Sequence, residues 1–141
     1  MIFHKAKYYN TDVVQIGAMK SRYPQFKVVK RGKEIEFIGT LLVQPVFPVY
    51  TVSITYRGDL KPLIRILNPE LVADPPHFYK ENRSLCLYHP ANYNWVKEKL
   101  IAKDIVSWTA AWIYFYEKWL EKGIWYGPEA SHYDNDKYEN N

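Results

Sequence analysis

Cysteine is nearly absent from this chain of 141 residues, in which Cys86 is the single example. One cysteine cannot form an internal disulfide, which is typical of proteins from a reducing compartment. Long apolar runs are also missing, since no stretch approaches the roughly 20 apolar residues that a membrane-spanning helix requires. The segment from Met1 to Tyr9 lacks the apolar run of a cleavable signal sequence. We therefore expect a soluble, cytoplasmic protein that does not contact a membrane.

Neither sign of charge forms a long block. The formal net charge of +4 is modest, and the basic residues are dispersed along the chain. The densest basic group falls around a predicted turn and consists of Lys27, Lys30, Arg31 and Lys33. Because basic residues at a turn usually form a solvated loop, we expect no nucleic-acid partner. Nucleic-acid binding remains a distant alternative, which a steep dependence of binding on salt would reveal.

Cofactor motifs are lacking as well. Nothing resembles a P-loop or a dinucleotide-binding fingerprint, and no G-x-S-x-G elbow is present to make Ser84 the nucleophile of a hydrolase. The set of His77, Cys86 and His89 is a poor zinc site, because its spacing matches no closed-site pattern and a fourth ligand is missing. We expect neither a cofactor nor a metal.

Aromatic residues, in contrast, are abundant. They make up 17% of the chain and include five Trp and thirteen Tyr. A chain of this length is expected to form one domain around its own core, which we place at residues 1–133. Residues 134–141 are polar and are expected to be disordered. Part of the aromatic excess should pack the core, and the rest is available for interfaces.

The apolar pattern predicts an α+β fold. A helix is expected over residues 11–23, capped by Thr11 and closed by Pro24. Apolar and polar residues then alternate in short runs separated by turns, which predicts a four-stranded antiparallel meander. The expected strands are 26–29, 35–43, 50–56 and 63–67. Prolines break up residues 68–100, a loop long enough to be functional.

The strongest helical signal covers residues 103–121. Ile105 begins an apolar stripe whose other members lie three or four residues apart: Trp108, Trp112, Phe115 and Trp119. Such a stripe is more often core than a binding face. We therefore expect this helix and Trp95 to be structural, with the stripe against the sheet. Gly123 is a natural end for the helix.

Cys86 is the first candidate for chemistry. It lies in the proline-broken loop, nine residues after His77 and three residues before His89. A free cysteine is often a buried structural residue. A neighbouring imidazole, however, can take the proton of a thiol or lower its pKa, which makes the sulfur a nucleophile. The spacing alone is compatible with both interpretations.

The stretch from Leu71 to Trp95, LVADPPHFYKENRSLCLYHPANYNW, carries a more specific pattern. Cys86-Leu87 comes nine residues after the histidine of Pro75-Pro76-His77, and Trp95 comes nine residues after the cysteine. This order resembles the ubiquitin-conjugating (E2) enzymes, in which a proline-rich segment and a His-Pro-Asn motif precede the catalytic Cys-Leu and a later Trp. Roughly residues 10–132 share the resemblance. The end of the chain is similar to prokaryotic E2-like families with a W-x-G-x-E-x-x-H pattern, matched here by Trp125, Gly127, Glu129 and His132.

Among these families, the chain most resembles the stand-alone E2-like protein of type II CBASS antiphage operons. The resemblance implies an E2 (UBC-like) fold with a long active-site loop, and Cys86 as the catalytic residue. It implies a thioester between Cys86 and the C-terminus of a partner, a cGAS-like nucleotidyltransferase (CD-NTase), followed by transfer to an amine. No cofactor is needed for this transfer, because the thioester itself keeps the free energy to acylate a nucleophile.

One departure from the E2 pattern concerns the asparagine that helps to hold the oxyanion. Its position would be near Tyr79, and no asparagine stands there. The groups that could replace it are Asn82, Asn92, Asn94 and backbone N–H groups. The resemblance gives His77 a mainly structural role in tying down the loop, and it leaves His89 as the candidate for tuning the thiol.

The missing asparagine supports an alternative function. Some E2-like domains have lost catalysis and only dock on a partner protein, and this chain could be such a binding module. The Cys86-Leu87 pair, which stands in the E2 register, argues against that loss.

Overall fold

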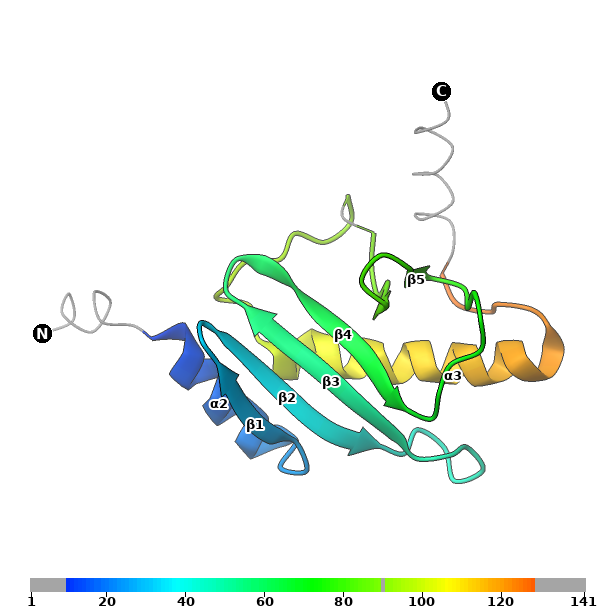
Figure 1. The fold of residues 1–141 in the computed structure, drawn as a ribbon, viewed down its shortest axis with the longest axis horizontal. Coiled ribbons are helices and arrows are strands. Elements are labelled where there is room, and N and C mark those ends of the chain that lie inside the picture. Colours follow the sequence, from blue (N-terminus) through cyan, green and yellow to red (C-terminus); the bar gives the residue numbers. More distant parts are fainter. Residues whose placement is uncertain (1–9, 90, 129–141) are drawn as a thin grey trace, which may run out of the picture.

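A computed structural model describes residues 10–89 and 91–128 of the chain. Figure 1 shows a four-stranded sheet lying across a long C-terminal helix, with a shorter N-terminal helix beside its first strands. This arrangement confirms the predicted α+β class, the N-terminal helix, the antiparallel sheet and the C-terminal helix. The expected polar tail, residues 134–141, lies outside the described residues. The elements in chain order are α2 (Thr11–Arg22), β1 (Lys27–Arg31), β2 (Glu34–Leu41), β3 (Tyr50–Arg57), β4 (Leu60–Asn68), β5 (Phe78–Tyr79), β6 (Ser84–Leu85), a π-helical turn η1 (Ile101–Ile105) and α3 (Val106–Lys122).

The main sheet is a meander in the order β1-β2-β3-β4, with every neighbouring pair antiparallel. Gly32 and Gly58 make its tight turns, at φ values of 62° and 65°, a region that glycine enters without steric cost. The register places Phe37 opposite Ile54, and Ile54 opposite Ile64. Because side chains alternate along a strand, this register puts one continuous apolar face on the sheet.

That apolar face forms the core together with the two helices. From the helices come Met19 on α2 and Trp112, Ile113 and Tyr116 on α3, all at most 3% exposed. The sheet contributes fully buried side chains from its two central strands: Ile35, Phe37, Tyr50, Val52, Ile54 and Tyr56. Trp95 adds its indole at one end, edge-on to the ring of Tyr56, and donates a hydrogen bond of 2.9 Å to the carbonyl of Gly58. Its predicted structural role is thus confirmed.

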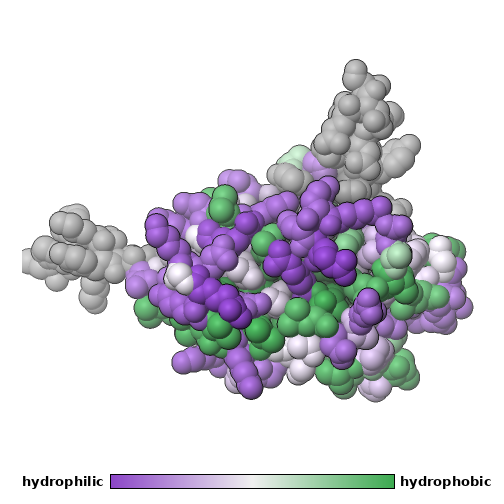
Figure 2. All heavy atoms as spheres, in the orientation of Figure 1, coloured by the Kyte–Doolittle hydropathy of each residue, from purple (hydrophilic) through white to green (hydrophobic). Residues whose placement is uncertain are grey.

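The opposite face of the sheet is largely polar. Figure 2 views the molecule in the orientation of Figure 1 and shows hydrophilic residues over much of this side, interrupted by hydrophobic patches. Glu36 on β2 accepts hydrogen bonds from Ser53 of β3 at 2.5 Å and from Arg31 of β1 at 3.0 Å. One carboxylate therefore links three neighbouring strands.

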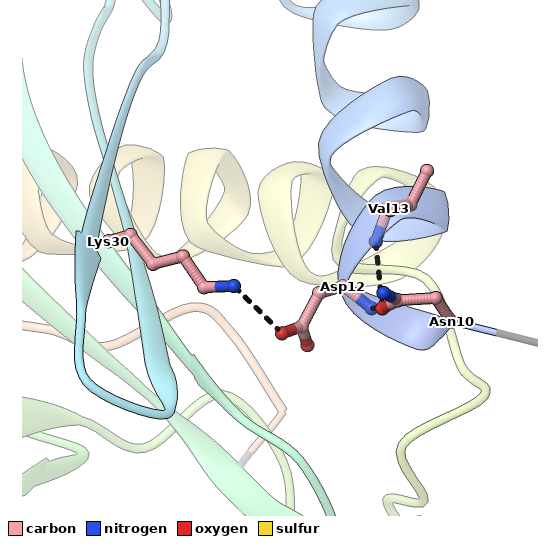
Figure 3. A network of polar contacts seen from close by, with 4 residues as sticks. All are labelled: Asn10, Asp12, Val13 and Lys30. Atoms are coloured by element: carbon pink, nitrogen blue, oxygen red, sulfur yellow. Dashed lines mark hydrogen bonds and ion pairs between the residues drawn. The ribbon is translucent and has the colours of Figure 1, made fainter.

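The N-terminus of α2 differs from the prediction that Thr11 caps it. Asn10 is the cap: its side-chain oxygen accepts from the backbone N–H groups of Asp12 and Val13, at 3.0 and 3.4 Å (Figure 3). Asn and Thr are both good cap residues, and here the chain places Asn one position earlier. Asp12 extends toward β1 and pairs with Lys30 at 3.6 Å.

The buried face of α2 carries an unpredicted polar residue, Gln15, which is 1% exposed. Its amide donates to the carbonyl of Lys99 at 2.6 Å and accepts from the N–H of Ile101 at 3.0 Å. Gln15 thus satisfies the backbone where the long loop enters η1. Val13, an apolar residue of the same helix, is 63% exposed.

Candidate active site

The loop that carries Cys86 is organised by a small second sheet. Tyr79 of β5 pairs with Ser84 of β6, and Phe78 pairs with Leu85. Asn82 in the connecting turn holds this hairpin, since its side-chain oxygen accepts from Ser84 at 2.5 Å and its carbonyl accepts from Arg65 of β4 at 2.9 Å. These contacts fix the position of the residue that follows β6, which is Cys86.

Three non-glycine residues before Cys86 have positive φ: Asp74, His77 and Arg83, at 55°, 52° and 58°. This left-handed conformation costs an ordinary residue roughly 1–2 kcal/mol, so it persists only where neighbouring contacts maintain it. In His77 these contacts are visible. Its carbonyl accepts from the Cys86 N–H at 2.9 Å and from the Trp112 indole N–H at 3.0 Å, while its ring lies on Trp125 with centroids 4.8 Å apart.

Cys86 itself is 7% exposed. Its thiol lies 3.6 Å from the carbonyl of Tyr88, and Cys86 is one of the residues that line the cavity described below. Burial in apolar surroundings disfavours a thiolate. A nucleophilic role therefore requires a hydrogen-bond donor or a positive charge near the sulfur.

Tyr79 supplies such a donor, and sequence reasoning had marked its position only as that of a missing asparagine. Burial and, second, a hydrogen bond between the side chains of Tyr79 and Cys86 raise the pKa of the Tyr79 hydroxyl. A raised pKa keeps this hydroxyl protonated, and so able to donate, at neutral pH. The ammonium of Lys61 lies 4.2 Å above the centre of the Tyr79 ring, a cation–π contact that helps to hold the ring in place.

His89 lies on the same cavity as Cys86 but already has a local partner. Its Nδ1 accepts from the backbone N–H of Ala91 at 3.0 Å. In the neutral ring the proton is therefore on Nε2, which is buried and has no hydrogen-bond partner among the described residues. In this arrangement His89 presents an N–H donor rather than a base.

A half-open cavity of about 360 Å³ connects these residues. Its walls come from the Cys86 loop, from one side of α3 and from the segment that follows the helix. The lining residues are His77, Cys86, Leu87, Tyr88, His89, Asn92, Trp108, Ala111, Trp112, Phe115, Trp125 and Pro128. The structure thus brings together all three sequence-predicted site residues, and of the candidate asparagines it adds Asn92.

The predicted apolar stripe of α3 is only partly correct. Trp112 is 3% exposed, contacts the core and also reaches the cavity. The other fully buried positions are Thr109, Ile113 and Tyr116 rather than Trp108 or Phe115. Trp108 and Phe115 are half-buried cavity walls, so the face of the helix toward the sheet is rotated from the aromatic stripe.

Gly123 ends α3 in the left-handed conformation, at φ 72°, and the chain turns back so that Trp125 contacts both Phe115 and Trp112, at 5.8 and 5.9 Å between ring centroids. A side chain at Gly127 would come within 2.7 Å of Phe115. Glycine is therefore required for this close approach. Glu129 and His132, the other two residues of the W-x-G-x-E-x-x-H pattern, lie outside the described residues.

The family model of the type II CBASS E2 protein matches residues 15–133. The chain belongs to this family. Membership implies a role in antiphage defence, and it suggests a ubiquitin-conjugation-like role and protein partners. No individually curated protein matches the chain.

Two further observations bear on this CBASS E2 protein. Among residues 10–89 and 91–128, no group of three or more His, Cys, Asp or Glu side chains is placed to hold a metal ion. No helix in the same ranges is both long and apolar enough to cross a membrane.

Proposed function

We propose that this type II CBASS E2 protein is an acyltransferase with a UBC-like fold, whose catalytic domain is residues 1–133. Cys86 forms a thioester with the C-terminus of a CD-NTase partner and passes the acyl group to an amine. The observation that carries the proposal is the position of Cys86, in the E2 register of the sequence and on the wall of a cavity with a hydroxyl donor at its sulfur.

The reaction has two balanced steps. The donor arrives activated at its C-terminus, as an acyl adenylate or as the thioester of another protein. The Cys86 thiolate attacks the acyl carbon, a C–S bond forms, and the activating group leaves with its electron pair. A neutral amine then attacks the same carbon, a C–N bond forms, the C–S bond breaks, and the amine proton passes to solvent or a nearby base.

Tyr79 is the residue we place at the sulfur during both steps. A hydrogen bond from its hydroxyl stabilises the thiolate before attack and when the thiolate leaves. His77 has a positioning role, because its carbonyl holds the Cys86 N–H and the Trp112 indole. His89 would contribute an N–H donor at the cavity wall, where charge develops on the acyl oxygen.

Co-expression with the neighbouring genes of the operon, followed by gel analysis with and without a thiol reductant, tests the proposal. The wild-type protein should form an adduct that the reductant cleaves. Cys86→Ser should accumulate a reductant-stable oxyester, because serine is a poorer leaving group. Cys86→Ala should form no adduct while still binding its partner. An adduct that survives in Cys86→Ala would place the chemistry elsewhere.

A docking module is the second candidate, and two observations favour it. Cys86 is only 7% exposed, and no asparagine stands at position 79. This candidate predicts partner binding without any adduct, even when every candidate activating enzyme of the operon is present.

A further inference from the structure

We infer that the cavity beside Cys86 selects the acyl donor by an apolar side chain within its last two residues. The inference rests on the proposed function and deepens it by naming the class of C-terminus that the site accepts.

The covalent bond itself restricts where the donor can lie. In a thioester the acyl carbon is bonded to the Cys86 sulfur, so the α-carbon of the terminal residue is only two bonds from that sulfur. Since an extended chain advances about 3.3–3.6 Å per residue, the last two residues must lie against the immediate surroundings of Cys86. Those surroundings include the cavity of about 360 Å³, which falls in the roughly 300–1,000 Å³ range of ligand sites.

The chemistry of the walls favours an uncharged, apolar occupant. Trp108, Phe115 and Trp125 contribute aromatic side chains to the walls. Apart from the two histidines, no acidic or basic side chain belongs to the described lining residues. A donor lysine or aspartate would lose hydration here without gaining an opposite charge, whereas an apolar side chain would gain from leaving water.

The polar atoms of the wall fit the backbone of such a donor. His89 Nε2 and Trp125 Nε1 are buried N–H groups with no hydrogen-bond partner among the described residues. Unpaired buried donors are rare in folded proteins, and each calls for an explanation such as a catalytic role or a bound water or ion. Both atoms are donors, and peptide carbonyls are acceptors, so the backbone next to an apolar terminal side chain could pair with them. The lysine that receives the acyl group could not pair with them in its ammonium form, since an ammonium group can only donate hydrogen bonds.

The test uses six-residue peptide thioesters of a small thiol that differ only in their last two residues, which are apolar, glycine, acidic or basic. Acylation of Cys86 is followed by intact mass, with acetyl thioester as a donor too small to need the cavity. We expect peptides with an apolar ending to react at least about tenfold faster than those with a charged ending, a ratio typical of side-chain selection by an apolar pocket.

Ala111→Trp fills the cavity from an exposed position of α3. This variant should lose the preference among peptides, measured as the ratio of the acylation rates for apolar and charged endings. Leu120→Trp is the matched control, because Leu120 is 46% exposed on the same helix and is not a lining residue. It should keep the preference.

A binding measurement separates the two levels of the proposal. Peptide amides with the same endings are titrated against Cys86→Ala, and tryptophan fluorescence reports occupancy of the cavity. Acylation of Cys86 at equal rates by all peptides would overturn the selection and leave the transferase function standing. Selective binding without any acylation would uphold the selection and overturn the transferase function, and the absence of both would overturn both.

Discussion

The hydroxyl of Tyr79, which lies near the position expected for the oxyanion asparagine of E2 enzymes, hydrogen-bonds with the Cys86 side chain. A phenol is longer than a carboxamide and donates only one hydrogen bond. We therefore expect the Tyr79 hydroxyl to act on the Cys86 sulfur rather than on the acyl oxygen.

Tyr79→Phe tests that role. Loss of a hydrogen bond to a charged acceptor costs about 1.5–3 kcal/mol, and each 1.36 kcal/mol raises the pKa of the thiol by about one unit. The variant should be alkylated by iodoacetamide about tenfold more slowly at a fixed pH below the thiol pKa. Its rate–pH profile should shift to higher pH, because the thiol then stays protonated up to a higher pH.

Tyr93→Phe is the control for Tyr79→Phe. The Tyr93 hydroxyl is buried without a hydrogen-bond partner among the described residues, and its ring contacts Tyr88 and Trp108. Removing that hydroxyl should leave the alkylation profile unchanged. Equal profiles for Tyr79→Phe and the wild type would remove Tyr79 from the site.

Gln15 provides a second test at the scale of one residue. Gln15→Leu introduces an apolar side chain of similar size but leaves the Ile101 N–H and the Lys99 carbonyl without their partner. Each orphaned buried group costs about 1–3 kcal/mol, so urea unfolding should show a loss in that range or above. Gln25→Leu, whose hydrogen bond to Thr40 is exposed, should change stability by no more than about 0.5 kcal/mol.

At the scale of the element, α3 shows which features of a helix could be predicted from the sequence and which could not. Its existence, and its end at Gly123, followed from periodicity and helix-capping chemistry. The buried face did not follow, because Trp and Phe carry large apolar surfaces and a stripe of such residues normally indicates the core. Thr109 is fully buried, yet its hydroxyl donates to the carbonyl of Ile105 at 2.7 Å. A polar residue satisfied by its own helix is invisible to a count of apolar positions.

Trp112 should be the most costly aromatic residue of α3 to remove. Trp112→Ala opens a core cavity and breaks the indole hydrogen bond to His77, with an expected loss of about 3–5 kcal/mol. Trp119→Ala, at a half-buried position of the same helix, should cost clearly less. Equal losses in chemical denaturation would contradict the assignment of Trp112 to the core.

The outer face of the sheet predicts a dependence on acid. Hydrogen bonding from Ser53 first, opposed by burial and aided by Arg31, lowers the pKa of Glu36 from its ordinary value of 4.5. A lowered folded-state pKa means that the ionised carboxylate stabilises the fold above pH 4.5. This contribution is lost as the pH falls through the folded-state pKa. Thermal melts of the wild type should therefore lose stability over that acidic interval.

Glu36→Gln lacks the titrating group and should show a flatter decline of melting temperature over the same interval. At neutral pH it should be the less stable protein, because the charged acceptor of the Ser53 and Arg31 hydrogen bonds is gone. Parallel melting curves for the two proteins between neutral pH and pH 3 would contradict the role of this carboxylate.

For the whole molecule, the order of elements and the meander could be predicted from alternation, turns and periodicity. The grouping of His77, Cys86 and His89 around one cavity also agrees with their spacing. Several side-chain contacts could not be predicted in this way. Trp125 returning onto His77, Gln15 holding the carbonyl of Lys99 and Tyr79 bonding to Cys86 all depend on how the loop closes in space.

Trp112 belongs to the core, holds the His77 carbonyl and forms part of the cavity wall. Any mutation of it changes folding, loop position and donor choice together, so its freedom to vary across lineages should be small. Trp108, Ala111 and Phe115 line the same cavity without full burial. A lineage whose partner acquires a new C-terminus can adapt at these three positions while the scaffold stays intact. We therefore expect these three positions to co-vary with the C-terminal sequence of the partner when related operons are compared.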